Sequence, residues 1–221
     1  MKSGPYILWD WNGTLLDDSA ACVGALNRML AGRGLPPIDL ERYRRDFSFP
    51  ARGFYERIGM RLELEDWDAL AKEYHDAYLA EPAVLAADAV EALRLARSLA
   101  CGQSIISALR QDHLDIATDR YGVREYFDVV RGTDNLDGAS KLERAHELVG
   151  ELAAKGVRNL VLIGDSLHDK EVADAIGARA VLYSGGSHAA ERLAPFAPVS
   201  ASLVGCVRLA VPDADSVARA R

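Results

Sequence analysis

Short apolar segments recur along this chain, and most of them end at a glycine, an aspartate or a serine. They cover residues 6–9, 103–107, 128–131, 159–163 and 179–183. Runs of this length and composition are typical of strands that a parallel sheet buries on both faces. Between them, over 90–99 and 142–152, apolar residues recur with the period of a helix. Strands that alternate with helices predict right-handed crossovers and a doubly wound α/β sheet.

The alternation stops between residues 17 and 84, where the pattern predicts several helices and no buried strand. Asp39 precedes one of these helices and is suited to cap it, because its side chain can accept a hydrogen bond from the first turn. A stripe of aromatic and aliphatic residues at helical spacing marks another helix, and we interpret the stripe as core. The helices are expected over 19–30, 40–46 and 65–80. We therefore expect a helical domain of residues 17–84, inserted into an α/β core of residues 1–16 and 85–221.

Composition excludes several classes of protein. The chain has 221 residues, enough for one large domain or for a domain with an insert. Of these residues 49% are hydrophobic, as in an ordinary globular protein. Its 26 basic residues against 33 acidic ones leave a net charge of −7. Because binding to a phosphate backbone requires a surplus of positive charge on some face, we expect no nucleic-acid partner.

The sequence also indicates where the protein works. Its three cysteines have no CxxC spacing, so they suggest neither a zinc site nor a disulfide framework and point to a reducing compartment. No apolar run reaches the ~18 residues of a membrane span, and the first residues do not form a signal peptide. We therefore expect a cytoplasmic protein without a membrane partner, either a monomer or a homodimer.

Chemically active side chains follow several of the predicted strands. Ligands of open α/β sheets bind beyond the carboxyl ends of the strands, so these side chains are expected to meet at one edge. They are a carboxylate after the first strand, a hydroxyl at the end of the second, a cation before a helix, and an acidic pair after the fourth strand: Asp10, Ser107, Lys141, Asp165 and Asp169. This set of groups is the equipment for handling phosphate with a divalent metal.

Each group has a physical role in phosphate chemistry. The Asp10 carboxylate would attack phosphorus and form an aspartyl phosphate, which splits one displacement into two. A Mg²⁺ ion held by Asp10, a backbone carbonyl and Asp165 would cancel the repulsion between that carboxylate and a phosphate dianion. Hydrogen-bond donors and a point charge would meet the phosphoryl oxygens: Thr14, Ser107, Lys141 and the backbone amide of Gly13.

Four motifs, in this order, resemble those of the haloacid dehalogenase-like (HAD) superfamily of phosphohydrolases. They are DWNGT at 10–14, Ser107, Lys141 and GDSLHD at 164–169, and they span nearly the whole chain. The pattern is most similar to the phosphoglycolate phosphatase and β-phosphoglucomutase-like branch. This resemblance implies a Rossmann-like core with a small α-helical cap, and a Mg²⁺-dependent phosphatase of a small phosphorylated metabolite.

The resemblance also implies roles for individual residues. The nucleophile would be Asp10, and Asp169 would be either a metal ligand or a partner of Lys141. The implied catalytic residues are Asp10, Asn12, Ser107 and Lys141. The implied metal ligands are Asp10, Asn12 through its backbone carbonyl, Asp165 and Asp169. The implied phosphate-binding residues are Gly13, Thr14, Ser107, Ala108 and Lys141.

One position departs from the family pattern. Where the family has a second aspartate that protonates the leaving alcohol and then activates water, this chain has Asn12. An amide keeps the backbone carbonyl and can donate a hydrogen bond, but it cannot exchange a proton. General acid–base catalysis typically contributes ~10²–10⁴-fold, so the substitution matters for alkyl phosphates. Three explanations stay open: a leaving group that needs no proton, another acid such as His168 or a cap residue, or a role without turnover.

The expected cap should decide the substrate. Its segment RRDFSFPARGFY carries arginines beside an aromatic and proline turn, and Arg45 or Arg52 could clamp a carboxylate or second phosphate of the substrate. The alternative is that these arginines are solvated on a helix surface. Asp17 and Asp18 are interpreted as capping the first cap helix or setting the hinge.

Two other functions compete with a phosphatase. Phosphonoacetaldehyde hydrolases, which cleave a C–P bond, also lack the second aspartate, but their chemistry needs a cap lysine that forms a Schiff base. Lys72 is the lysine that the insert offers. The other alternative is a non-catalytic protein that senses a phosphometabolite or binds a partner, having lost turnover with Asn12.

Overall fold

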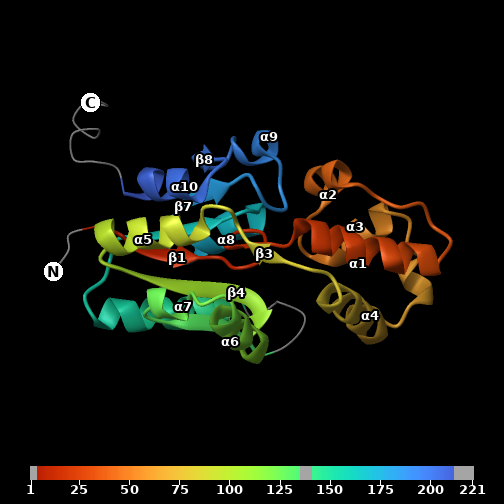
Figure 1. The fold of residues 1–221 in the computed structure, drawn as a ribbon, viewed down its shortest axis with the longest axis horizontal. Coiled ribbons are helices and arrows are strands. Elements are labelled where there is room, and N and C mark those ends of the chain that lie inside the picture. The colour runs from red at the N-terminus through yellow and green to blue at the C-terminus, as the bar shows by residue number, and fades with distance from the viewer. Residues whose placement is uncertain (1–3, 135–140, 212–221) are drawn as a thin grey trace.

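The computed structural model describes residues 4–134 and 141–211. Within these residues the centre is a six-stranded sheet in the order β5-β4-β1-β6-β7-β8, and every neighbouring pair of strands is parallel (Figure 1). The strands are β1 (Tyr6–Trp9), β4 (Gly102–Arg110), β5 (Val130–Thr133), β6 (Leu160–Gly164), β7 (Arg179–Tyr183) and β8 (Val199–Ser200). The predicted doubly wound parallel sheet is confirmed.

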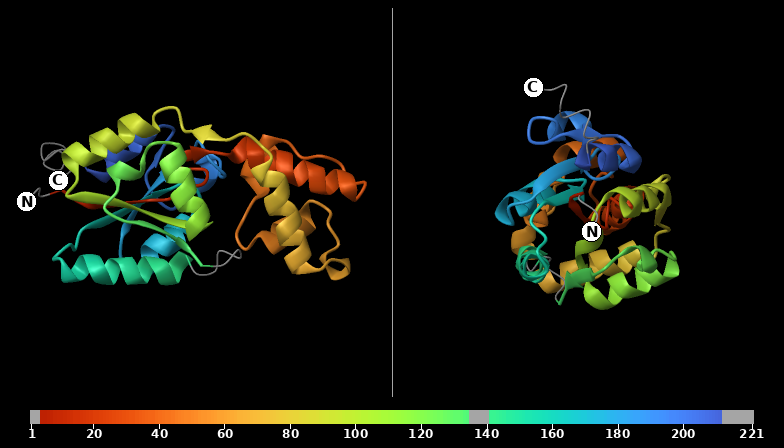
Figure 2. Two further views of the ribbon diagram at one scale, coloured as in Figure 1. Left: turned by 60° about the horizontal axis from the view of Figure 1, so that its bottom comes forward. Right: turned by 90° about the vertical axis from the view of Figure 1, so that its left-hand side faces the viewer.

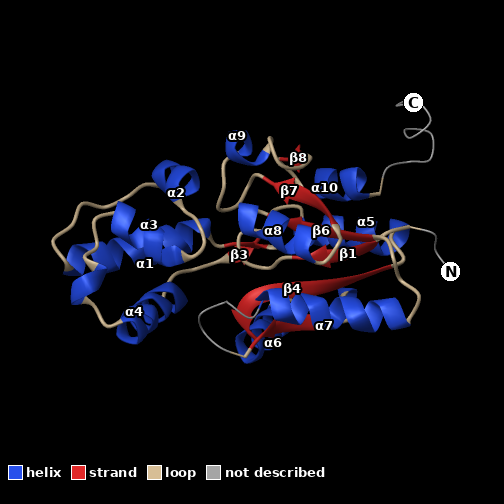
Figure 3. Ribbon diagram, turned by 180° about the vertical axis from the view of Figure 1, so that it is seen from behind, coloured by secondary structure: helices blue, strands red, loops and turns tan. Residues whose placement is uncertain are grey.

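Helices cover both faces of this sheet (Figure 3). Side chains alternate along β1, so that Ile7 and Trp9 belong to one apolar core and Tyr6 and Leu8 to the other. The first core is closed by α5 (Ala89–Leu99), α6 (Gln111–Arg120) and α10 (Leu203–Ala210), and the second by α7 (Lys141–Ala154) and α8 (Leu167–Ala175). Burial on both faces explains why the strands are continuous apolar runs. In the described part of the chain, no helix has the length and apolar character that a membrane span requires.

The predicted strand limits differ from the structure at several places. β5 begins at Val130 rather than at Asp128. β4 continues to Arg110 instead of ending at Ser107, because a register shift after Ile106 lets its pairing with β5 resume. β8 was not predicted, since a strand of two residues contains no pattern. Two short helical elements complete the core, η2 (Arg124–Tyr126) and α9 (Ala190–Leu193).

The helical insert has an apolar core of its own. Its elements are α1 (Ser19–Gly32), α2 (Leu40–Asp46), α3 (Ala51–Arg57), η1 (Leu62–Leu64) and α4 (Trp67–Leu79). Phe54 and Leu70 are fully buried among them. Asp39 caps α2, as predicted, by accepting a hydrogen bond from the Arg42 N–H at 2.7 Å. Figures 1 and 2 show the insert beyond one end of the sheet, the end at which β1 finishes.

The chain passes between sheet and insert at a two-stranded antiparallel ribbon, β2 (Leu16–Asp17) with β3 (Val84–Leu85). Asp18 comes next and precedes α1, but its side chain makes no capping hydrogen bond to that helix. Of the two roles expected for Asp18, a side-chain cap of α1 is therefore not formed, and the other, that Asp18 sets the hinge, stays a prediction. The physical reason for the missing cap is that donors outside the helix hold the Asp18 carboxylate, as described below.

Candidate active site

The register of the sheet brings the predicted site residues to one edge. Trp9, the last residue of β1, pairs with Ile105 of β4 and with Ile163 of β6. Asp10 stays tied to β6, because its backbone N–H donates to the carbonyl of Ile163 at 2.9 Å. Asp165 directly follows β6, so it lies beside Asp10 at the carboxyl edge of the sheet.

Lys141 joins two of the carboxylates. It is the first residue of α7, and its ammonium lies 2.5 Å from Asp10 Oδ1 and 2.7 Å from Asp169 Oδ1. Burial lowers the pKa of the Lys141 ammonium, but the charges of Asp10 and Asp169 outweigh burial and raise it above the ordinary value. Lys141 is therefore a fixed positive charge beside the predicted nucleophile.

The hydroxyl of Thr14 connects Asp10 with Asp165, another predicted metal ligand. The Thr14 hydroxyl oxygen lies 3.2 Å from Asp10 Oδ2 and 3.4 Å from Asp165 Oδ1, so its one hydrogen is within reach of both carboxylates. The other oxygen of Asp165 accepts from the backbone N–H of Ser187 at 2.5 Å. One carboxylate oxygen from each of Asp10, Asp165 and Asp169 lies within 4.8 Å of the other two. The structure thus gathers the predicted nucleophile and the acidic pair into one cluster.

Two glycines let the backbone approach Asp165. Gly13 has φ of +76°, and a Cβ atom added to it would lie 2.2 Å from Asp165 Oδ2. A Cβ atom added to Gly186 would lie 2.1 Å from the carbonyl oxygen of Gly13 and 2.3 Å from the same oxygen of Asp165. Only a residue without a side chain fits at either position. Gly186 and Ser187 were not predicted as site residues, because they follow a strand without belonging to a motif.

When its three carboxyls are ionised, the acidic cluster carries more negative charge than its hydrogen-bonded cation neutralises. Asp10, Asp165 and Asp169 are all buried, and Lys141 is the cation that the structure places against them. Burial raises the pKa of Asp10 to about 7, and burial together with the neighbouring carboxylates raises that of Asp165. Burial also acts on Asp169, but the Lys141 charge reverses the effect and lowers its pKa. A divalent metal ion would remove the excess charge, and oxygen donors are the ligands that such ions prefer, so the donor set fits a metal site.

Asp169 was expected either to bind the metal or to support Lys141, and its hydrogen bonds favour the second role. Oδ1 accepts from Lys141, while Oδ2 accepts from the backbone N–H of Ser166 at 3.0 Å and from its hydroxyl at 2.6 Å. Ser166 in turn caps α8, and the two residues form a capping box. Both oxygens of Asp169 are thereby engaged by protein groups that hold it beside Lys141.

Ser107 and Ala108 lie inside β4, close to the same edge of the sheet. The Ser107 side chain is buried, and its oxygen accepts from the backbone N–H of Leu109 at 3.0 Å. A hydroxyl that accepts one hydrogen bond still has its own hydrogen to donate. The carbonyl of Ala108 accepts from the hydroxyl of Thr133 at 3.0 Å. That both residues contact a bound phosphate stays a prediction.

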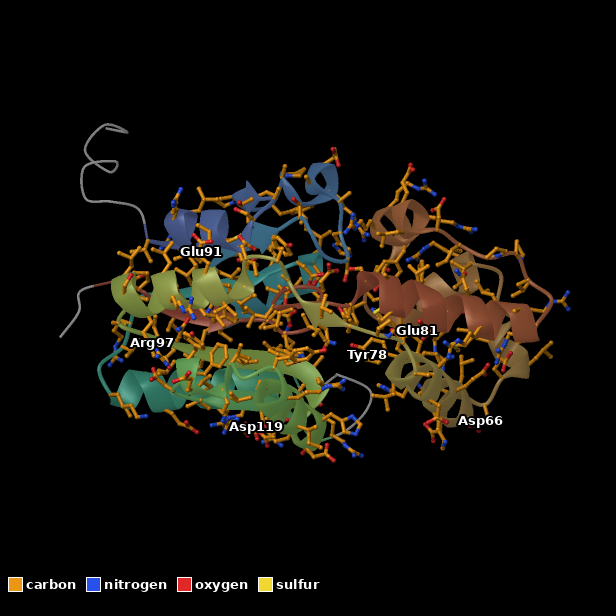
Figure 4. The ribbon with its side chains drawn as sticks, in the orientation of Figure 1. Asp66, Tyr78, Glu81, Glu91, Arg97 and Asp119 are labelled. Atoms are coloured by element: carbon orange, nitrogen blue, oxygen red, sulfur yellow. The ribbon has the colours of Figure 1, made fainter. Side chains whose placement is uncertain are left out.

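Asn12 is held by groups from the hinge and from the insert. Its Nδ2 donates to Asp18 Oδ2 at 2.7 Å and to the Tyr78 hydroxyl at 3.0 Å. The Tyr78 hydroxyl donates to the same Asp18 oxygen at 2.6 Å, and the Gly13 N–H donates to Asp18 Oδ1 at 2.7 Å. Burial raises the pKa of Asp18, against these hydrogen bonds, which lower it. Figure 4 shows Tyr78 on α4, between the insert and the core.

The side chains of the two arginines predicted to bind substrate contact groups of the insert. Arg45 pairs with its neighbour Asp46 at 2.9 Å, and its side chain is 62% exposed. The Arg52 guanidinium lies 4.6 Å from the centre of the Trp67 ring, in a cation–π contact. Their assignment as substrate ligands stays a prediction.

Arg44, which was not selected from the sequence, connects the insert to the core. Its guanidinium donates to the carbonyl oxygens of Gly185 at 2.6 Å and Gly186 at 2.9 Å. Arg192 of the core donates to the carbonyl of Phe47 in the insert. Contacts with backbone carbonyls depend on the path of a loop rather than on a motif, so the sequence carried no signal for them.

Comparison with known proteins agrees with this geometry. The family model described as haloacid dehalogenase-like hydrolase matches residues 7–183. The chain is 32% identical over 192 residues to the phosphoglycolate phosphatase of Caulobacter vibrioides, across 83% of this chain and 81% of that protein. Among solved structures, a haloacid dehalogenase-like protein of Agrobacterium tumefaciens has a TM-score of 0.74 at 21% identity and covers 99% of this chain and 100% of its own. A predicted phosphatase of Clostridium acetobutylicum has a TM-score of 0.74 at 16% identity, with coverage of 93% and 97%. The chain therefore belongs to the haloacid dehalogenase-like hydrolases and is an enzyme of that family, as its motifs predicted.

Proposed function

We propose that this enzyme is a Mg²⁺-dependent phosphatase that hydrolyses a small phosphorylated metabolite through an aspartyl phosphate on Asp10. The observation that carries the proposal is the buried contact between Lys141 and Asp10, beside the carboxylate of Asp165. A carboxylate can attack a phosphate dianion only where their repulsion is cancelled, and this cluster supplies a fixed cation and metal ligands at that place.

The first step belongs to Asp10. One of its oxygens attacks phosphorus, and the bond from phosphorus to the leaving oxygen breaks. Lys141 and the Thr14 hydroxyl orient the Asp10 carboxylate and meet the phosphoryl oxygens as charge moves onto them. Mg²⁺ held by Asp10, Asp165 and the backbone carbonyl of Asn12 would act as a Lewis acid on the phosphoryl group. Water then attacks phosphorus and restores the Asp10 carboxylate.

We expect the insert, residues 17–84, to act as a cap that selects the substrate. The name of the Caulobacter relative makes phosphoglycolate the first candidate, and a sugar phosphate of similar size is the second. Arg45 or Arg52 would serve such a substrate by turning toward its carboxylate or second phosphate. We expect the reaction to take place in the cytoplasm, with the protein as a monomer or homodimer.

Structural observations bear on both alternatives. C–P bond cleavage requires a lysine that forms a Schiff base close to the substrate. Lys72, in the insert, has a side chain that is 75% exposed and pairs with Asp76 at 2.6 Å, which speaks against that chemistry. Asn12 favours a role without turnover, since an amide cannot exchange a proton. The buried pair of Lys141 and Asp10 favours turnover, because a binding protein has no need of a nucleophile.

A phosphate-release assay tests the proposal. The protein is incubated with Mg²⁺ and phosphoglycolate, sugar phosphates, acyl phosphates, p-nitrophenyl phosphate or phosphonoacetaldehyde. Asp10→Asn and addition of EDTA should each abolish release, whereas Asp17→Asn, which removes an exposed carboxylate of β2, should preserve it. If no compound of the panel releases phosphate while Mg²⁺ and phosphate still bind, the phosphatase proposal is refuted and the role as a phosphometabolite sensor is favoured.

A further inference from the structure

The carboxylate of Asp18, which lies outside the predicted catalytic set, links three parts of the molecule. Asp18 is 2% exposed and stands between the loop of the nucleophile and α1. Its Oδ1 accepts from the backbone of Gly13, and its Oδ2 accepts from the Asn12 amide and from the Tyr78 hydroxyl. Tyr78 comes from α4 (Figure 4), so donors from the core loop and from the insert meet at one buried carboxylate of the hinge.

This arrangement fixes which way the Asn12 amide is turned. An asparagine side chain has a nitrogen that donates two hydrogen bonds and an oxygen that only accepts. Asn12 Nδ2 donates to Asp18 Oδ2, 2.7 Å away, and to the Tyr78 oxygen, 3.0 Å away, and these two oxygens lie 2.6 Å apart on the same side of the amide nitrogen. The reverse orientation would set the amide oxygen against a carboxylate oxygen, and an ionised carboxylate has no hydrogen to share.

The consequence concerns what residue 12 offers to a substrate. Among residues 4–134 and 141–211, no group donates a hydrogen bond to Asn12 Oδ1. Nδ2 is thus directed at Asp18 and Tyr78, and the amide oxygen is the side-chain polar atom of Asn12 that has no partner among these residues. Residue 12 offers no acidic proton to a substrate, whereas a protonated carboxyl would.

We propose that Asp18 is a positioning residue that fixes this orientation of Asn12, and that the enzyme is thereby specialised for phosphates whose leaving group departs without receiving a proton. The inference rests on the proposed function, because it concerns the leaving group of the same reaction. It narrows the expected substrates to acyl and aryl phosphates, in place of phosphoglycolate and sugar phosphates, whose leaving groups are alkoxides. Tyr78 takes part as the second acceptor of the amide, so the orientation also depends on the position of the insert.

The chemistry of both steps follows from the orientation. As the bond between Asp10 and phosphorus forms, the bond from phosphorus to the leaving oxygen breaks, and that oxygen takes the electron pair. Asn12 has no proton to give, so the group departs as an anion, which favours carboxylates and phenolates over alkoxides. In the second step, Asn12 Oδ1 accepts a hydrogen bond from the water that attacks phosphorus. The bond from phosphorus to Asp10 then breaks, and both protons of the water remain on the released phosphate.

Nuclear magnetic resonance of the Asn12 side-chain amide tests the orientation without any substrate. The two amide proton signals are assigned in ¹⁵N-labelled protein by their loss in Asn12→Asp. Asp18→Asn should shift both signals, because the carboxylate that fixes the amide is gone, and Tyr78→Phe should chiefly move one. Asp17→Asn removes a neighbouring exposed carboxylate and is the matched control. Signals that move no further in Asp18→Asn than in Asp17→Asn would overturn the proposal.

An exchange of amide and carboxylate tests the consequence for the leaving group. kcat/KM is measured on phosphoglycolate, which has an alkoxide leaving group, and on p-nitrophenyl phosphate, for Asn12→Asp and for the double variant Asn12→Asp/Asp18→Asn. The double variant keeps an amide against a carboxylate, now with the carboxylate at position 12. It should gain ~10²-fold on phosphoglycolate and change less than ~10-fold on p-nitrophenyl phosphate, since only the alkoxide needs a proton.

The single variant separates positioning from the mere presence of a carboxyl at position 12. In Asn12→Asp the new carboxyl shares its proton with Asp18 instead of directing it to the leaving group, so its gain on phosphoglycolate should be at least ~10-fold smaller than that of the double variant. An equal gain in the single variant would overturn the proposal. If no form of the enzyme releases phosphate from either compound, the proposed function fails, and the amide signals still decide whether Asp18 fixes Asn12.

Discussion

Replacing Lys141 with methionine removes the ammonium and keeps most of the volume of the side chain. Lys141 is 3% exposed, and it bonds to Asp10 at 2.5 Å and to Asp169 at 2.7 Å, both of which are buried as well. Removing one partner of a buried ion pair typically costs ~3–5 kcal/mol, because an uncompensated charge stays behind. Both carboxyls can take up a proton, which keeps the cost within this range. We therefore expect metal-free Lys141→Met to lose ~3–5 kcal/mol of unfolding free energy at pH 8.

The loss should shrink as the pH falls. In the unchanged protein the Lys141 charge lowers the pKa of Asp169, so Asp169 adds stability above its unfolded pKa and loses that contribution as the pH falls through the folded one. Without Lys141, burial alone acts on Asp169 and raises its pKa. A carboxyl with a raised pKa costs stability as the pH rises from the unfolded toward the folded value. The two proteins should therefore differ most at pH 8 and least near pH 5.

Urea unfolding followed by circular dichroism, in EDTA at pH 5 and pH 8, measures this difference. Lys155→Met removes an exposed lysine at the end of the same helix and should change the free energy of unfolding by no more than ~0.5 kcal/mol. A loss below ~1 kcal/mol for Lys141→Met at pH 8, or the same loss at both pH values, would refute the reasoning.

Three further predictions concern the metal, a glycine and the insert. Mg²⁺ should raise the melting temperature more at pH 8 than at pH 5.5, because Asp10, whose pKa burial raises to about 7, is protonated at the lower pH. An equal rise in melting temperature at both pH values, measured by calorimetry, would contradict this. Gly186→Ala should abolish most activity and lower the free energy of unfolding by ~1–3 kcal/mol, because its Cβ would lie 2.1 Å from a carbonyl oxygen. The control Gly150→Ala, whose Cβ meets open space, should not destabilise the protein in urea unfolding. Arg44→Ala should raise KM more than it lowers kcat, since Arg44 holds the insert to the core. An unchanged KM, or the same rise in KM when the exposed Arg61 is replaced by alanine, would contradict this prediction.

The sheet could be predicted from the sequence because its strands are buried on both faces. Tyr6–Trp9 and Arg179–Tyr183 have the predicted limits, since each is an apolar run that ends at a polar residue. β8 and the ribbon of β2 and β3 consist of strands with two residues each, and so short a segment carries no periodicity. Their pairing is decided by contacts that form only when the rest of the chain is in place.

Two serines illustrate how the sheet resolves what the sequence left open. Ser107 was chosen from a predicted strand that also carries Ser104, and the sequence alone does not fix which of the two serines lies nearer the edge of the sheet. The Ser104 hydroxyl bonds to that of Tyr6 at 2.6 Å and accepts from the Val129 N–H, so it is used in the core. Ser107 lies further along β4, toward the carboxyl edge, which supports its choice as the candidate.

Asp18 shows why part of the candidate site could not be predicted. An aspartate before a helix fits the pattern of a cap, and the sequence contains nothing that contradicts this interpretation. The competing donors are Tyr78, from a distant helix, and Asn12, whose amide is available only because the family's aspartate is absent. By contrast, Lys141 and Asp10 both belong to motifs, and they were expected to meet at one edge of the sheet, although their direct contact was not predicted.

The central claim is that Asp10 becomes phosphorylated during turnover, and acid quenching tests it most directly. The enzyme is mixed with Mg²⁺ and an acyl phosphate, stopped in acid within a single turnover, digested, and examined by mass spectrometry. We predict one phosphoryl group on the peptide that contains Asp10, and none in Asp10→Asn or after addition of EDTA. Phosphate release without any phosphoryl group on that peptide, or with the group on another residue, would contradict the account.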